Sequence, residues 1–152
     1  MMKKIFILFL FILTSCGYQS LYKVNKEINN FKIQEIKLDG DKKTSEKIFN
    51  NLPFILVKKD KNLNKVTISS DKKIIEASKN SKGQVTSYKT SLAVKFLILD
   101  INGNIISQKF SQKEFSYNTD ENKFKLKEYQ NKIEENLINS ITDDIIIYLN
   151  YS

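Results

Sequence analysis

Residues 86–99 alternate apolar and polar side chains more regularly than any other part of the chain. Alternation with a period of two is typical of a β-strand that buries one face, because successive side chains point to opposite sides of a sheet. The segment therefore predicts a long strand whose apolar face needs a cover. That face comprises Tyr88, Thr90, Leu92, Val94, Phe96 and Ile98, and the opposite face carries Lys89, Ser91, Ala93 and Lys95.

The residues that follow predict a hairpin. Asn102-Gly103 is a strong signal for a type I′ turn, in which both central residues have positive φ. Residues 104–117 would then form the antiparallel partner strand. The parity of its apolar residues changes between Phe110 and Phe115, which predicts a β-bulge between them.

Three elements are expected before this hairpin. Residues 31–38 predict a strand with a break in its alternation, which indicates a bulge or an end of pairing. Residues 43–51 predict a short helix that Thr44 or Ser45 would cap. Residues 64–77 predict another strand.

An apolar stripe over residues 121–149 predicts a long amphipathic helix that Thr119 or Asp120 would cap. A small sheet with one apolar face needs such a cover. We therefore predict an α+β two-layer sandwich: a mostly antiparallel sheet of about four strands, covered by a short helix and a long C-terminal helix. The stripe consists of Leu126, Tyr129, Ile133, Leu137, Ile141, Ile145 and Leu149.

The N-terminus predicts secretion. Lys3 and Lys4 precede an apolar run over residues 5–13, and small residues follow, which is the order found in a secretory signal peptide. As a helix the run would rise only about 14 Å, roughly half the hydrocarbon thickness of a bilayer. A permanent membrane span is therefore not expected there.

The end of this segment, Leu13-Thr14-Ser15-Cys16, resembles the bacterial lipobox. The resemblance implies lipidation of Cys16, cleavage before it, and anchoring by the attached lipid; the alternative is an ordinary signal peptide with a chance cysteine. We predict a signal peptide over 1–15, a lipidated tether over 16–30 and one domain over 31–152. Gly17 is not the aspartate that retains lipoproteins in the inner membrane of enteric-type bacteria. Attachment to the periplasmic side of the outer membrane is therefore expected.

Every one of the 25 basic residues is a lysine, and the net charge is +8. Loss of Lys3 and Lys4 with the signal peptide lowers it to +6. Mobile ammonium groups suit phosphate-rich or anionic lipid partners. A secreted, lipid-anchored chain is in the wrong compartment for nucleic acid, so we expect no nucleic-acid partner. A general bias towards Lys, Asn and Ile accounts for part of the excess.

The residue types argue against an enzyme. The chain has no histidine and one cysteine, which excludes Cys/His metal sites and His-based nucleophile arrangements. The acidic pairs Glu134-Glu135 and Asp143-Asp144 fall on the expected helix, where neighbours in sequence do not face each other, so a solvated face is the simpler reading. We expect no catalytic site, no metal and no cofactor.

The expected mature chain starts with Cys16-Gly17-Tyr18, and the predicted strand, short helix, three-strand meander and long helix follow. Its C-terminal half contains Gly83-Gln84, Tyr88, Phe115-Ser116-Tyr117, Leu126-Lys127-Glu128 and Glu135-Asn136-Leu137-Ile138. In these segments and in their order the chain resembles the LPS-assembly lipoprotein family, LptE, most closely between Gly83 and Leu149.

This resemblance implies a specific function. Members of the family plug the lumen of the outer-membrane barrel LptD, help it to assemble, and bind lipopolysaccharide on its way to the cell surface. Their basic loop residue maps onto Lys82, or with a small gap onto Lys79. A second basic position falls near Asn118, where this chain departs from the family, although Lys123 and Lys125 lie close in sequence. The alternative is an auxiliary lipoprotein of an ABC-type envelope lipid transporter, without a barrel partner.

Overall fold

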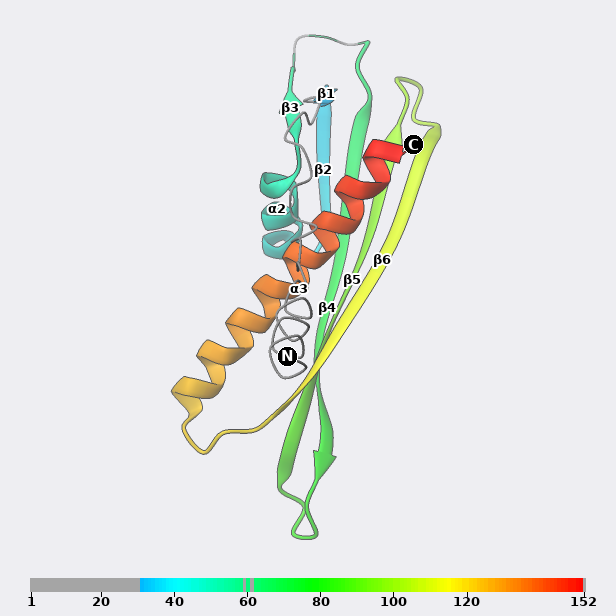
Figure 1. Ribbon diagram of the computed structural model, residues 1–152. Helices are drawn as coiled ribbons and strands as arrows, with labels where there is room; N and C mark the ends of the chain where they lie inside the picture. The colour runs from blue at the N-terminus through cyan, green and yellow to red at the C-terminus, as the bar shows by residue number, and fades with distance from the viewer. Residues whose placement is uncertain (1–30, 59, 61, 152) are drawn as a thin grey trace, which may run out of the picture.

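A four-stranded sheet forms one layer of the computed structural model, which describes residues 31–58, 60 and 62–151 (Figure 1). The strand order is β2-β4-β5-β6; β2 runs parallel to β4, and the other neighbours are antiparallel. Two helices, α2 and α3, pack with this sheet, so the predicted α+β architecture is confirmed. The elements are β2 (Glu35–Gly40), α2 (Lys42–Asn51), β4 (Lys65–Lys79), β5 (Val85–Leu99), β6 (Ile105–Asn118) and α3 (Lys123–Tyr151).

A second, two-stranded sheet pairs β1 (Phe31–Ile33) with β3 (Phe54–Leu56) in parallel. The strand expected over 31–38 is thus divided at Gln34, which separates β1 from β2. The break in alternation marked this end of pairing correctly, because the two halves belong to different sheets, while the apolar side chains of both pack against one core.

The core lies between the sheet and α3. Strand β5 contributes its predicted face, with Leu92, Val94 and Phe96 fully buried. Most of the predicted α3 stripe is also buried, and Ile138 joins it. Leu126 is only partly buried and Tyr129 is exposed, so α3 covers the sheet less completely at its start than further along.

Both helix caps differ from those predicted. The side chain of Asp41 caps α2, accepting a hydrogen bond from the Thr44 amide at 3.0 Å, while Thr44 and Ser45 are fully buried inside the first turn. Asn122 caps α3, accepting from the amides of Phe124 and Lys125 at 3.0 and 3.1 Å. In each case the cap is the side chain directly before the first helical residue, where it can reach the free amides.

The β5–β6 connection is not a type I′ turn, because no non-glycine residue among those described has positive φ. Gly103 alone has positive φ there, its amide donates to the Asp100 carbonyl, and the amide of Asp100 donates to the Asn104 carbonyl. These bonds describe a type I turn followed by a left-handed glycine. The bulge predicted between Phe110 and Phe115 is also wrong.

The register of β6 runs without interruption from Ser107 to Asn118, and its irregularity falls at Ile105–Ser107 instead. The apolar parity changes because Phe110 points away from α3, and not because the strand slips. No helix within the described residues has the length and hydrophobicity needed to cross a membrane. Cys16, the signal peptide predicted over 1–15 and the tether predicted over 16–30 lie outside the described residues.

Candidate functional site

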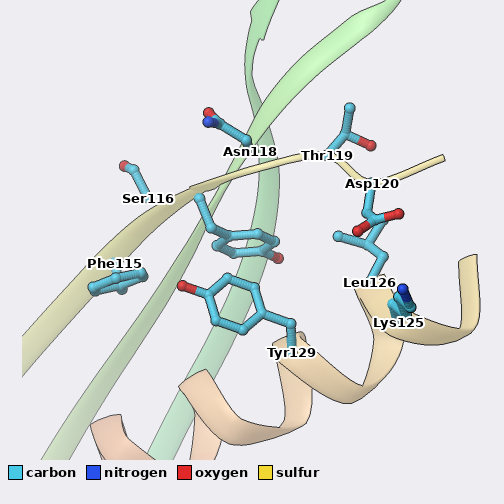
Figure 2. Close-up of a pocket in the computed structure, with 9 residues that line it drawn as sticks. Phe115, Ser116, Asn118, Thr119, Asp120, Lys125, Leu126 and Tyr129 are labelled. Atoms are coloured by element: carbon cyan, nitrogen blue, oxygen red, sulfur yellow. The ribbon is translucent and has the colours of Figure 1, made fainter. Parts of the chain in front are cut away.

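An open pocket of about 480 Å³ lies between the end of β6 and the start of α3 (Figure 2). It exists because α3 starts away from the sheet and closes onto it only further along. The chain between β6 and α3 is held by a hydrogen bond from the Thr119 amide to the Thr86 carbonyl of β5 at 3.0 Å. The pocket is lined by Phe115, Ser116, Tyr117, Asn118, Thr119, Asp120, Lys125, Leu126 and Tyr129.

The rings of Tyr117 and Tyr129 line this pocket, and a third tyrosine ring packs against that of Tyr117. Tyr88 of β5 stacks on Tyr117 of β6 with ring centroids 6.0 Å apart, and Tyr117 meets Tyr129 of α3 edge-on at 5.9 Å. The Tyr117 hydroxyl contacts the Thr90 hydroxyl at 3.3 Å, which satisfies both buried polar groups. The three rings tie the first turns of α3 to the sheet through aromatic contacts.

Apolar side chains stay exposed beside the pocket, on the face of the sheet that α3 covers elsewhere. Ile74, Thr90 and Phe115 form one row across β4, β5 and β6. Thr90 is buried, yet Ile74 is 45% exposed and Phe115 is 47% exposed. Exposed apolar surface beside a pocket favours binding of an apolar or amphipathic ligand.

The four lysines predicted for lipopolysaccharide binding do not form one cluster. Lys125 lines the pocket, and Lys123 begins the same helix. Lys82 lies in the turn of the β4–β5 hairpin, which extends past the start of α3 (Figure 1). Lys79 is engaged already: its ammonium lies 2.8 Å from Glu76, and this hydrogen bond raises the pKa of Lys79.

Within the described part of the chain, no ion pair involves Lys82, Lys123 or Lys125. These three ammonium groups are therefore available to an anion. Asn118, to which the resemblance assigned the second basic position, does line the pocket. The neighbouring ammonium there comes from Lys125 across the pocket and not from β6.

Two polar clusters fix the rest of α3 to the sheet. Lys72 of β4 lies 2.9 Å from Glu134 of α3 and 3.4 Å from Asp41 at the start of α2. Burial acts to lower the pKa of Lys72, but its hydrogen bond to Glu134 and the charges of Glu134 and Asp41 outweigh burial and raise that pKa. The ammonium therefore joins both helices to the sheet.

The second cluster joins α3 to β6. Asp144 accepts a hydrogen bond from the Ser111 hydroxyl at 2.7 Å and lies 2.9 Å from the ammonium of Lys113. Burial acts to raise the pKa of Asp144, but these contacts outweigh it and lower that pKa. A purely solvated face is thus wrong for Glu134 and Asp144. A signal for this contact was present in the sequence: Ser111 and Lys113 lie on the face of β6 that points towards α3, where polar side chains need a polar partner.

The geometry suits binding better than catalysis. The pocket offers an apolar wall and one ammonium, that of Lys125, near the N-terminus of α3. Among the described residues, no group of three or more side chains is arranged to hold a metal ion.

Comparisons with known proteins establish the fold. No protein-family model matches the chain, and no curated protein sequence matches it. The structure is similar to rare lipoprotein B from Shewanella oneidensis, with a TM-score of 0.57 and 14% identity over 77% of this chain and 94% of that one. It is also similar to a minor lipoprotein from Acinetobacter baumannii, with a TM-score of 0.56 and 17% identity over 77% and 88%.

An uncharacterized lipoprotein B from Nitrosomonas europaea is similar too, with a TM-score of 0.56 and 8% identity over 76% of this chain and 82% of that one. At these identities the likeness establishes a shared fold. Each of the three comparison structures is matched over most of its own length, so the similarity is not confined to a fragment.

Proposed function

We propose that this chain is a lipid-anchored envelope lipoprotein of the outer membrane that plugs an LptD-type β-barrel and binds lipopolysaccharide during transport. The observation that carries the proposal is the α+β fold, which is shared with three proteins described as lipoproteins. The lipobox at Cys16 and the resemblance to the LptE family support the same assignment. The role is one of binding and positioning, without catalysis.

The pocket between β6 and α3 supports the lipopolysaccharide part of the proposal. Lipopolysaccharide combines acyl chains with phosphate groups, so its receptor needs an apolar surface beside cations. Phe115, Leu126 and Tyr129 supply the apolar surface, and Lys125 supplies a cation at its rim. Lys82, on the projecting hairpin, supplies a second cation that a large headgroup can reach.

Purification from the native host tests the barrel assignment. We expect the full chain, tagged at its C-terminus and extracted from outer membranes in mild detergent, to bring down a barrel of LptD type in comparable amount. Mass spectrometry of the eluate identifies the partner. An unrelated tagged lipoprotein from the same membrane serves as the control for non-specific recovery.

Two results would contradict this assignment. Recovery of the chain without any barrel, under conditions that keep other outer-membrane complexes intact, would remove the plug function. Recovery of the components of an ABC-type lipid transporter instead would favour the alternative of an auxiliary transporter lipoprotein.

Removal of the two available lysines is expected to weaken lipopolysaccharide binding. The double variant Lys82→Ala with Lys125→Ala lacks two ammonium groups that have no ion-pair partner among the described residues. In the parent protein these groups are available to attract the phosphates of the ligand. We expect about a tenfold rise in Kd at low salt, equivalent to about 1.4 kcal/mol. The difference should shrink as salt screens the remaining charges. Titration of lipopolysaccharide against the immobilised mature protein measures both effects.

The matched control removes the same charge elsewhere. Lys73 and Lys132 are exposed and paired with Asp71 at 2.7 Å and Glu128 at 2.9 Å. The double variant Lys73→Ala with Lys132→Ala should bind nearly as the parent does. Equal weakening by the two double variants would show that only the net charge matters, and would remove Lys82 and Lys125 from the site.

A further inference from the structure

The β5–β6 hairpin carries three isoleucines that are more than half exposed. Ile101 lies in the turn, and Ile105 and Ile106 begin β6. The end of α3 lies at the same end of the sheet, because the hydroxyl of Tyr148 contacts that of Ser107 at 2.5 Å. Tyr151, one turn further along α3, is almost fully exposed. One end of the molecule therefore presents large apolar side chains to solvent.

The turn itself does not require these isoleucines, as the other long hairpin shows. The β4–β5 turn has the same bonds: the amide of Asn80 donates to the Gln84 carbonyl, and the amide of Gly83 donates to the Asn80 carbonyl. Gly83 has positive φ, as Gly103 does. At the position that corresponds to Ile101, the β4–β5 turn has Ser81. A polar residue thus satisfies the same geometry, so the turn does not require an isoleucine at position 101.

The described chain begins near the apolar end of the molecule. The ring of Phe31 lies 6.0 Å from that of Phe54, which lies 6.0 Å from that of Phe96. Three residues separate Phe96 from the end of β5 at this hairpin, about 10 Å along the strand. In the other direction β5 continues for about 36 Å before the β4–β5 turn.

The length of the tether then decides which end meets the membrane. Residues 16–30, between the lipobox cysteine and Phe31, span at most about 50 Å when fully extended. Full extension is entropically costly, so the tether tends to be shorter than this limit. The end of the domain that lies nearer to Phe31 therefore stays closer to the bilayer. The nearer end is the one with the exposed isoleucines.

We propose that the β5–β6 hairpin is a membrane contact: Ile101, Ile105 and Ile106 lie among the headgroups and upper acyl chains of the leaflet that holds the lipid on Cys16. This inference rests on the lipid anchor of the proposed function but not on the barrel. Asp100 limits the depth of the contact. Hydrogen bonds from Asn104 and Asn102 lower the pKa of Asp100, so the turn keeps a charge at the headgroup level. The contact orients the domain and leaves the pocket and Lys82 at the end away from that leaflet.

A tryptophan reporter tests this orientation, because the chain has no tryptophan of its own. The mature lipidated protein is reconstituted in vesicles of phosphatidylethanolamine and phosphatidylglycerol, with or without bromine on the acyl chains. We expect the Ile101→Trp variant to emit at shorter wavelength in vesicles than in dilute detergent, and to lose most of its fluorescence in the brominated vesicles. The matched Ser81→Trp variant, at the same position of the other turn, should change in neither respect.

Each alternative outcome overturns the membrane contact. Quenching of both variants, of neither, or of Ser81→Trp alone would show that the hairpin is not the end held at the bilayer. A shift to shorter wavelength without quenching by bromine would show that a second copy of the chain covers the hairpin. Flotation of the same vesicles separates the two proposals: failure to float removes the lipid anchor, whereas flotation without quenching removes only the hairpin contact.

Discussion

Replacement of Gly40 by alanine is expected to lower the free energy of unfolding by about 2–5 kcal/mol, since left-handed strain of about 1–2 kcal/mol and overpacking of about 1–3 kcal/mol act together. Gly40 ends β2 with φ +73°. A β-carbon there would lie 2.0 Å from the carbonyl oxygen of Ser70 in β4. That oxygen accepts a hydrogen bond from the Asp41 amide at 2.9 Å, at the point where the chain leaves the sheet for α2. The clash is therefore with backbone that cannot move without breaking the β2–β4 pairing.

Gly83→Ala is the matched control. Gly83 has φ +77°, and nothing lies within 4 Å of a β-carbon placed there, so only the conformational cost of about 1–2 kcal/mol applies. Urea unfolding followed by circular dichroism gives both values, provided that the slope with urea is unchanged. If the two variants lost the same stability, close approach of Gly40 to Ser70 would be refuted and only the positive φ would remain.

The periodic elements of the fold were predictable because their signals are local. The alternation of residues 86–99 and the stripe along 121–149 place apolar side chains on one face of each element. In the structure these are the faces that the sheet and α3 bury against each other. The turns and caps were not predictable to the residue. Asp100 accepts hydrogen bonds from the amides of Asn102 and Asn104, and this side chain stabilises a type I turn where Asn102-Gly103 alone favours type I′.

The sequence indicated which lysines could bind an anion but not how they are grouped in space, and their role in binding stays a prediction. Lysines near the β4–β5 turn and the start of α3 follow from the sequence and the resemblance, whereas the pairing of Lys79 with Glu76 depends on the exact register of one strand. The pocket was even harder to predict from the sequence than the grouping of the lysines. It exists because α3 meets the sheet at an angle, and neither Phe115 nor Tyr129 carries a local signal that it will be left half covered.

Substitution of Cys16 by serine is expected to abolish both lipidation and processing. A lipobox peptidase requires the lipidated cysteine, so the Cys16→Ser chain should retain residues 1–15 and take up no labelled palmitate. Intact mass and acyl labelling of the protein purified from membranes measure the two effects. The domain over residues 31–152 should melt at the parent temperature, because the core of the described residues extends from Ile33 to Leu149 and the substitution lies outside it.

The Ser15→Ala variant is the control, since it keeps a small residue before the cysteine and should be cut and acylated as the parent is. Normal cleavage of the Cys16→Ser chain would show that residues 1–15 form an ordinary signal peptide and that the cysteine is incidental. That result would also remove the basis for placing the β5–β6 hairpin at a bilayer, because the argument from tether length requires a fixed point at Cys16. The pocket beside α3 would be unaffected, since all its lining residues lie between Phe115 and Tyr129, far from Cys16 in the sequence. Anchor and pocket are therefore separable: loss of the anchor would change where the pocket is presented, but not the residues that form it.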